Sequence, residues 1–233
     1  MIDGKKLLGL VVGRGGSKGL PGKNVMPLLG KPVVAWTVEA ALQSQYLDKI
    51  IISSDDDEII AAAVAVGAEA PFKRPPELAG DHVTLNPVIL HALNQMDEAY
   101  DYVVLLQATS PLRNVQDIDA CIETLHEHSA PSCLSVYETI APPFQTFVLA
   151  PGMKLKSAIG ETFREVQRQD MPDTYQLNGA VCVLNVEWFR RTEKLWSPET
   201  VGCVMPFERA VDIDTKTDFE LAVFYAERAQ RAL

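Results

Sequence analysis

The stretch LLGLVVGRGGSKGLPGKN, residues 7–24, decides the fold of this chain. Its first six residues are apolar throughout, which is typical of a strand buried on both faces of a parallel sheet. A loop from Gly13 to Asn24 follows, and a helical spacing from Pro32 to Leu42 comes next. A strand, loop and helix in this order place the loop at the carboxyl edge of the sheet, where α/β proteins bind ligands.

The same alternation of strand and helix continues along the first half of the chain. Strands are expected at 49–54, 102–106 and 132–137, and helices at 55–66, 84–99 and 114–128. The carboxylates of 55–58 suit the start of the first of these helices, Gly67 suits its end, and Asn86 before Pro87 is expected to cap the second. Apolar strands that alternate with helices predict a Rossmann-like, three-layer α/β fold with a mainly parallel sheet.

The rhythm breaks between residues 139 and 175, where four prolines accompany weak periodicity. Apolar residues such as Phe144, Phe147 and Val148 recur there and would otherwise be exposed. We therefore expect a single domain over residues 1–233 that carries an inserted arm at about 139–175. Strands at 179–184, 201–205 and 211–214 and a helix at 216–228 complete the prediction.

Charge and composition limit the possible partners. A net charge of −10 argues against a nucleic-acid-binding surface, and no apolar run approaches the length of a membrane span. Residues 1–31 nevertheless carry six Lys or Arg against Asp3 alone, which indicates a small bound anion. The four cysteines form no C-x-x-C pair, so we expect reduced, buried thiols in a cytoplasmic protein.

The loop after the first strand has the composition of a phosphate-binding loop. Its five glycines let backbone amides approach a phosphate chain, and its cations supply countercharge: Arg14, Lys18 and Lys23. It is not a Walker A loop, because Ser17 stands where glycine is needed and Asn24 where Ser or Thr would hold the metal. The dinucleotide fingerprint also fails, since Lys18 occupies the place of its third glycine.

Asp212 and Asp214 lie two residues apart in the last predicted strand, so their side chains are expected on the same face. Two adjacent carboxylates repel each other unless a cation lies between them, which predicts a site for Mg²⁺, or for Mn²⁺ in its place. Thr215 and Asp218 match a capping box at the start of the last helix, so Asp218 is expected to cap rather than to serve the site.

Five blocks in order carry a family resemblance: RGGSKGLPGKN (14–24), RPPELAGD (74–81), LLQATSPLR (105–113), NGA (178–180) and DIDTKTD (212–218). Together they resemble the CMP-N-acylneuraminate synthetases, or acylneuraminate cytidylyltransferases. Two departures stand out: Val12-Gly13 replaces the family's usual Pro-Ala, and Gln176 stands where several members have Arg.

The resemblance implies a homodimer joined through the arm, and a reaction of CTP with an acidic nine-carbon sugar that gives a CMP-sugar and pyrophosphate. It implies that Arg14 and Lys23 hold the triphosphate and that Asp212 and Asp214 hold the metal. The other substrate-binding residues it implies are Gly15, Gly16, Ser17, Lys18, Asn24, Arg74, Gln107, Thr109, Ser110, Arg113, Gln176 and Asn178. For Thr109 and Ser110, a simple helix-entry turn is an equally good explanation, whereas Gln107 ends an apolar strand and must point beyond the sheet edge.

Other functions stay open at this point. The acceptor could be another acidic sugar such as Kdo, the chain could be a glycosyltransferase with a similar nucleotide site, or it could bind nucleotides without catalysis. Among nonulosonic acids, the sequence does not choose between N-acetylneuraminate, legionaminate and pseudaminate.

Arg14→Ala and Lys23→Ala should each weaken the use of CTP while leaving the fold intact, because both residues are predicted on a loop outside the core. Steady-state kinetics with CTP test this expectation. Wild-type kinetics in either variant would show that the phosphate assignment is wrong.

Overall fold

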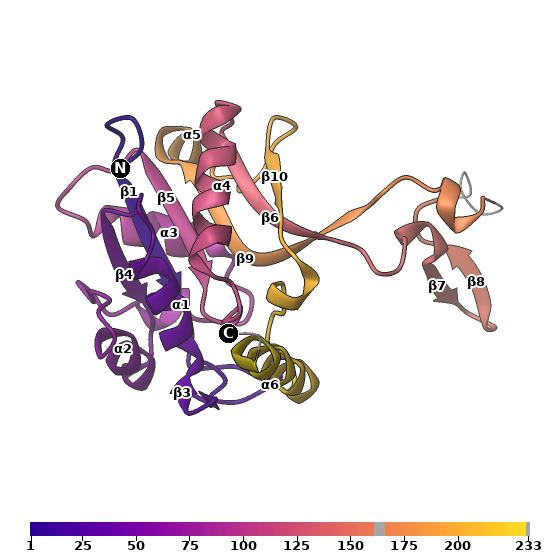
Figure 1. The fold of residues 1–233 in the computed structure, drawn as a ribbon, viewed down its shortest axis with the longest axis horizontal. Helices are drawn as coiled ribbons and strands as arrows, with labels where there is room; N and C mark the ends of the chain where they lie inside the picture. Colours follow the sequence, from indigo (N-terminus) through magenta and orange to yellow (C-terminus); the bar gives the residue numbers. More distant parts are fainter. Residues whose placement is uncertain (161–165, 232–233) are drawn as a thin grey trace.

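The computed structural model describes residues 1–160 and 166–231, which build a central six-stranded sheet with the order β10-β6-β9-β5-β1-β4 (Figure 1). All neighbours are parallel except β9, which runs antiparallel to both β5 and β6. The mainly parallel sheet predicted from the sequence is therefore confirmed. Its strands are β1 (Leu7–Val12), β4 (Lys49–Ser53), β5 (Tyr102–Gln107), β6 (Ser132–Glu138), β9 (Tyr175–Asn185) and β10 (Val201–Val204).

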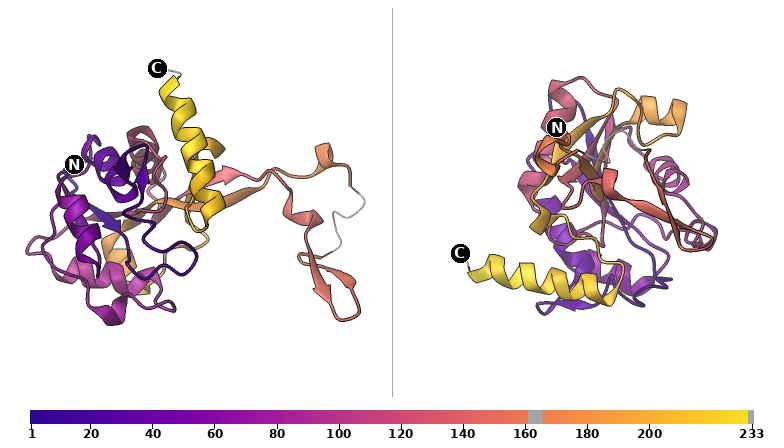
Figure 2. Two further views of the ribbon diagram at one scale, coloured as in Figure 1. Left: turned by 90° about the horizontal axis from the view of Figure 1, so that it is seen from below. Right: turned by 90° about the vertical axis from the view of Figure 1, so that its right-hand side faces the viewer.

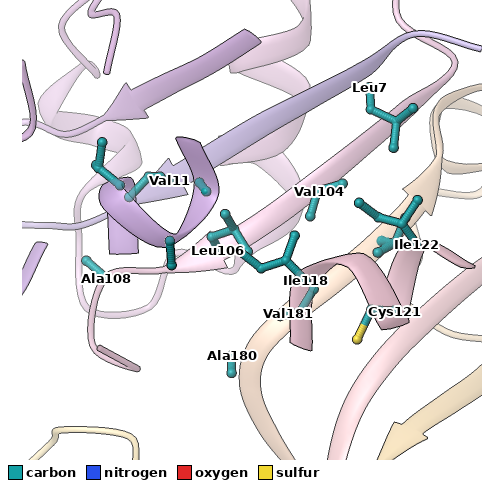
Figure 3. Packing of buried hydrophobic residues seen from close by; sticks show 14 of the residues in the cluster. Leu7, Val11, Val104, Leu106, Ala108, Ile118, Cys121, Ile122, Ala180 and Val181 are labelled. Carbon is teal, nitrogen blue, oxygen red and sulfur yellow. The ribbon is translucent and has the colours of Figure 1, made fainter. Parts of the chain in front are cut away.

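Helices cover both faces of the sheet. One face packs against α1 (Val33–Leu42), α2 (Asp57–Val64) and α4 (Val115–Glu127), and the other against α3 (Leu85–Asn94) and α5 (Val186–Thr192). Strand β1 is buried at every position because its side chains alternate between these two cores. Figure 3 shows the first core, where Leu7 of β1 lies toward Ile122 of α4 and Val11 lies beside α1. This is the expected three-layer arrangement.

Two helix starts follow the sequence prediction. Asp56 caps α2 by accepting hydrogen bonds from the backbone N–H groups of Glu58 and Ile59. Asn114 and Asp117 form a reciprocal capping box at the start of α4. α2 begins shortly after β4 ends, whereas α4 follows the longer segment 108–114 after β5; each cap therefore fixes the end of a loop at the sheet's carboxyl edge.

The predicted start of α3 at residue 84 is confirmed within one residue, but its predicted capping residue and its predicted end are wrong. Thr84 rather than Asn86 is its N-cap residue, and the helix ends at Asn94 rather than near Ala99. Asn86 lies within the first turn and its side-chain amide donates to the carbonyl of Glu193, so tertiary contact takes the place of capping.

The predicted last strand, 211–214, is also wrong. The segment forms no strand; its one sheet-like bond joins the Ile213 N–H to the Thr109 carbonyl at 2.8 Å. It crosses the carboxyl edge of the sheet and buries Val211 and Ile213 against α6 (Lys216–Arg231). Alternating burial produced the strand-like pattern without a neighbouring strand to pair with.

Between β6 and β9, the described residues 139–160 and 166–174 extend away from the body as an arm (Figure 1 and the left view of Figure 2). Its base is an antiparallel ribbon in which Tyr137 pairs with Gln176. Its described elements are the two-stranded pair β7 (Phe147–Ala150) and β8 (Lys154–Ser157) and the 3-10 helices Pro143–Gln145 and Arg168–Asp170.

The remaining elements are small. They are β2 (Pro27–Leu28), β3 (Lys31–Pro32) and the 3-10 helices Pro76–Leu78 and Phe207–Arg209. All four cysteines are buried and free, as the sequence predicts. Across the described ranges, we find no helix with both the length and the apolar character needed to span a bilayer.

Candidate active site

A cavity of about 540 Å³ opens at the carboxyl ends of β1 and β5. The β1–α1 loop forms one wall, the segment 78–85 faces it, and residues 214 and 215 close one side. Of the site residues predicted from the sequence, those that line the cavity are Arg14, Ser17, Lys18, Lys23, Asn24, Arg74, Gln107, Thr109 and Asp214. The structure thus brings together side chains that are up to 200 positions apart in the chain.

Lys23 fastens the loop to the C-terminal segment. Only 8% of it is exposed, and its Nζ donates to the carbonyl of Ile213 at 2.6 Å and to Asp214 Oδ1 at 2.7 Å. Gly19 allows this approach, because a Cβ there would lie 2.5 Å from the Asp214 carbonyl oxygen. The expectation that Lys23 lies outside the core is therefore wrong, and Lys23→Ala should loosen the fold locally. Arg14 is more exposed, so Arg14→Ala is still expected to weaken the use of CTP without changing the fold.

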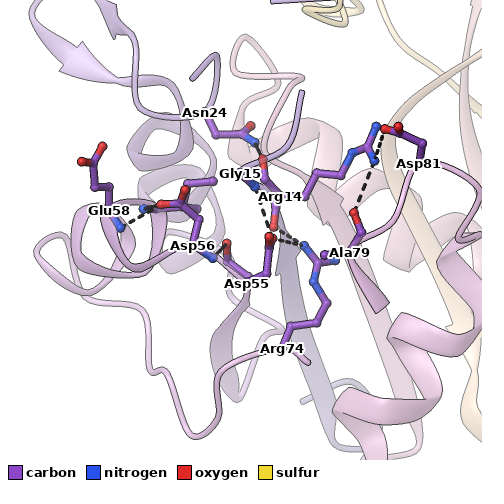
Figure 4. A network of polar contacts seen from close by, with 12 residues as sticks. Arg14, Gly15, Asn24, Asp55, Asp56, Glu58, Arg74, Ala79 and Asp81 are labelled. Carbon is purple, nitrogen blue, oxygen red and sulfur yellow. Dashed lines mark hydrogen bonds and ion pairs between the residues drawn. The ribbon is translucent and has the colours of Figure 1, made fainter. Parts of the chain in front are cut away.

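Arg74 supports the loop from below (Figure 4). It is 5% exposed, donates to the carbonyl of Gly13 and lies 3.6 Å from Asp55, whose carboxylate also accepts from the Gly15 N–H at 3.2 Å. Burial lowers the pKa of Arg74, and the neighbouring Asp55 partly offsets that effect. Sequence reasoning missed Asp55, because the acidic run 55–58 was explained entirely by helix capping.

Arg14 and Lys18 reach across the cavity to Asp81. Arg14 Nη1 lies 2.9 Å from one of its carboxylate oxygens and also donates to the Ala79 carbonyl at 3.4 Å (Figure 4). Lys18 Nζ lies 2.5 Å from the other carboxylate oxygen. Hydrogen bonding from Lys18 lowers the pKa of Asp81, and Arg14 acts in the same direction. Asp81 was also missed, although it ends the block at 74–81 that carries the family resemblance.

The two aspartates of the C-terminal segment differ in environment. The Asp214 side chain is 74% exposed and lines the cavity, whereas Asp212 is largely buried behind Thr109, from which it accepts a hydrogen bond. Burial raises the pKa of Asp212, and the nearby Asp214 raises it further. The two carboxylates were expected to need a cation nearby, and the ammonium of Lys23 is one such cation. Asp218 forms the predicted capping box with Thr215.

Other predicted residues lie beneath the cavity or outside it. Arg113, 2% exposed, donates from Nε to the Ala180 carbonyl at 2.7 Å, and burial lowers its pKa to about 9. Asn178 accepts from Ser135 and from the Ala180 N–H, which holds β9 against β6. Ser110 is fully buried, and Gln176 is exposed on the ribbon that leads to the arm.

Gly15 and Gly16, predicted to bind substrate, have different surroundings in the loop. The Gly15 N–H donates to Asp55, and Gly16 has open space around it. Neither forms part of the cavity wall.

Residues 8–158 match the family model described as cytidylyltransferase. The chain belongs to the cytidylyltransferase family. This membership makes it a nucleotidyltransferase, which agrees with a cavity lined by phosphate-compatible cations and two aspartates.

Curated relatives of this cytidylyltransferase act on related sugars according to their names. It is 32% identical to the CMP-N,N'-diacetyllegionaminic acid synthase of Legionella pneumophila over 98% of this chain and 99% of that protein. It is 31% identical to the pseudaminic acid cytidylyltransferase of Campylobacter jejuni (93% and 94%), and 30% identical to the N-acylneuraminate cytidylyltransferase of Escherichia coli (97% and 53%).

Solved structures share the fold of the cytidylyltransferase. A CMP:2-keto-3-deoxy-manno-octonic acid synthetase in complex with CTP superimposes with a TM-score of 0.69 at 17% identity, covering 97% of this chain and 99% of that one. The 4-diphosphocytidyl-2C-methyl-D-erythritol synthase of Anaerococcus prevotii gives the same TM-score at 13% identity, with 97% and 98% covered.

Gly19→Ala should lower kcat/KM for CTP by about tenfold or more, because the added Cβ displaces the loop from Asp214 and moves its cations. Gly16→Ala is the matched control, since a Cβ at that position meets nothing within 4 Å. Equal loss in both variants would mean that loop flexibility, and not the contact at Asp214, matters.

Proposed function

We propose that this enzyme transfers a cytidylyl group from CTP to the anomeric hydroxyl of a nonulosonic acid, giving the CMP-sugar and pyrophosphate. The observation that carries the proposal is the convergence of Arg14, Lys18 and Lys23 with Asp214 around one cavity at the carboxyl edge of the sheet. The names of the relatives, which include sialic, legionaminic and pseudaminic acid cytidylyltransferases, support this acceptor class.

In this reaction the loop binds the triphosphate and positions the α-phosphorus for attack by the sugar hydroxyl. Phosphoryl transfer needs mainly positioning and neutralisation of charge, which the three cations that line the cavity supply. Gln107 and Thr109 face the same cavity from the end of β5, where they can bind the nucleotide or the sugar. Arg74, held by Gly13 and Asp55, keeps the loop in place beneath the phosphates.

The residues fit a divalent cation at the C-terminal segment. Asp212 Oδ1 is buried without a hydrogen-bond partner, and Asp214 extends into the cavity. In the described part of the chain, no group of three or more His, Cys, Asp or Glu is placed to hold a metal, so phosphate oxygens and water would complete the shell. Asp212 and Asp214 would hold Mg²⁺, or Mn²⁺, which would supply positive charge to the phosphates.

The proposed activity is tested by measuring pyrophosphate release from CTP with N-acetylneuraminate, legionaminate, pseudaminate and Kdo as acceptors. We expect stoichiometric pyrophosphate and a CMP-sugar with at least one of the first three. Release of free CMP without a sugar product, or preference for Kdo, would contradict the assigned acceptor class.

Asp212→Asn and Asp214→Asn should each reduce turnover by about a hundredfold or more, because each loses a charge proposed to hold the metal. The melting temperature of Asp212→Asn should be unchanged or higher, since its carboxylate is buried. That of Asp214→Asn should fall slightly, since Lys23 loses its carboxylate partner. Pyrophosphate release against Mg²⁺ concentration, with thermal melts, gives both readouts; normal rates with an unshifted metal dependence would remove the metal site.

We also propose that the arm joins two copies of the chain in a homodimer. An isolated two-stranded ribbon is marginal in water, yet β7 and β8 and their turn expose large apolar side chains: Val148, Leu149, Met153 and Leu155 are all more than half exposed.

The free, buried cysteines support the expected cytoplasmic location.

Val148→Asp with Leu155→Asp should convert the dimer to a monomer in sedimentation velocity experiments, because charge on this surface opposes its burial. Leu42→Asp, at an exposed position on α1, is the control and should stay dimeric. A fully active wild-type monomer at assay concentrations would rule out the homodimer.

A further inference from the structure

In this structure, protein carboxylates pair with every cation that the β1–α1 loop presents to the cavity. Lys23 pairs with Asp214, while Arg14 and Lys18 share the carboxylate of Asp81. Asp81 belongs to the opposite wall, directly after the 3-10 helix Pro76–Leu78, and it lines the same cavity. The two walls of the cavity are therefore joined through an ionic contact at the place where phosphates are proposed to bind.

The donors that Asp81 occupies are the donors that a phosphate needs. Arg14 uses Nη1 for both Asp81 and the Ala79 carbonyl, and Lys18 Nζ lies 2.5 Å from the second carboxylate oxygen. A phosphate chain and the Asp81 carboxylate cannot both be close to these cations without repelling each other. Binding of phosphate must then displace Asp81 from at least one of them.

The contact is suited to such an exchange. The side chains of Arg14 and Asp81 are about one third exposed and that of Lys18 is mostly exposed, and ion pairs in such positions contribute little to stability. A phosphate group with several charged oxygens can therefore replace one carboxylate at these donors.

We propose that Asp81 is the resident counter-anion of the phosphate-binding cations: it holds Arg14 and Lys18 in the empty cavity, gives them up to the triphosphate, and takes them back as pyrophosphate leaves. This role rests on the proposed function of the loop and deepens it by assigning product release to a residue outside the loop. Asp81 is in this sense a positioning residue, because it acts on phosphate only through the two cations.

Removing the charge of Asp81 should strengthen pyrophosphate binding, because a competing anion is lost while both cations stay. We expect Asp81→Asn and Asp81→Ala to bind inorganic pyrophosphate at least about threefold more tightly than the wild type in calorimetric titrations with Mg²⁺. Product inhibition by pyrophosphate should strengthen by a similar factor. The control is Asp57→Asn. Asp57 lies on α2 outside the cavity, and its substitution breaks an exposed ion pair with Lys73, so this variant should bind pyrophosphate like the wild type.

Unchanged or weaker pyrophosphate binding in both Asp81 variants, with melting temperatures equal to the wild type, would overturn the proposal. The result is separable from the overall function. Tighter pyrophosphate binding in a protein that makes no CMP-sugar would leave the role of Asp81 standing and refute the proposed acceptor. Normal CMP-sugar synthesis with unchanged pyrophosphate affinity would leave the proposed acceptor standing and refute the role of Asp81.

Discussion

The site depends on the buried ammonium of Lys23, which joins the β1–α1 loop to the segment that follows β10. Its bonds to the Ile213 carbonyl and to Asp214 connect residues about 190 positions apart. Because Lys23 is nearly inaccessible to water, its charge requires close partners, and Asp214 and the carbonyl supply them. Neither segment belongs to the sheet, so this contact sets how far the phosphate-binding cations lie from the two aspartates.

The sheet supplies a rigid base for that arrangement. Strand β1 is buried at every position, and β5 ends at Gln107 beside it. Beneath them, Arg113 donates to carbonyl oxygens of Gln107 and Ala180, which ties the end of β5 to the antiparallel β9. A fully buried arginine in this position stabilises the floor of the cavity by donating to carbonyl oxygens of two adjacent strands.

Local patterns in the sequence predicted what depends on nearest neighbours along the chain. The buried strand at 7–12, the helix starts near 55–58 and at Asn114 and the position of the arm all leave periodic or compositional signals. The alternating pattern at 211–214 led to a wrong strand prediction, because alternating burial looks the same whether or not a partner strand lies alongside. Arg113 and Asn178 were grouped with the substrate-binding residues by motif, but a motif does not distinguish a side chain that touches ligand from one that holds the strand beneath it. Asp55 and Asp81 were missed, since their partners in the loop are 40 or more residues away.

Triphosphate binding is proposed to exchange the Asp81 carboxylate for phosphate at Arg14 and Lys18, while Lys23 stays joined to Asp214. A crystal structure of the protein with Mg²⁺ and a non-hydrolysable CTP analogue tests it most directly. We expect phosphate oxygens at Arg14, Lys18 and Lys23, the metal at Asp212 and Asp214, and Asp81 released from at least one of its two partners. A nucleotide bound with both Asp81 ion pairs intact and its phosphates away from the loop would refute this exchange.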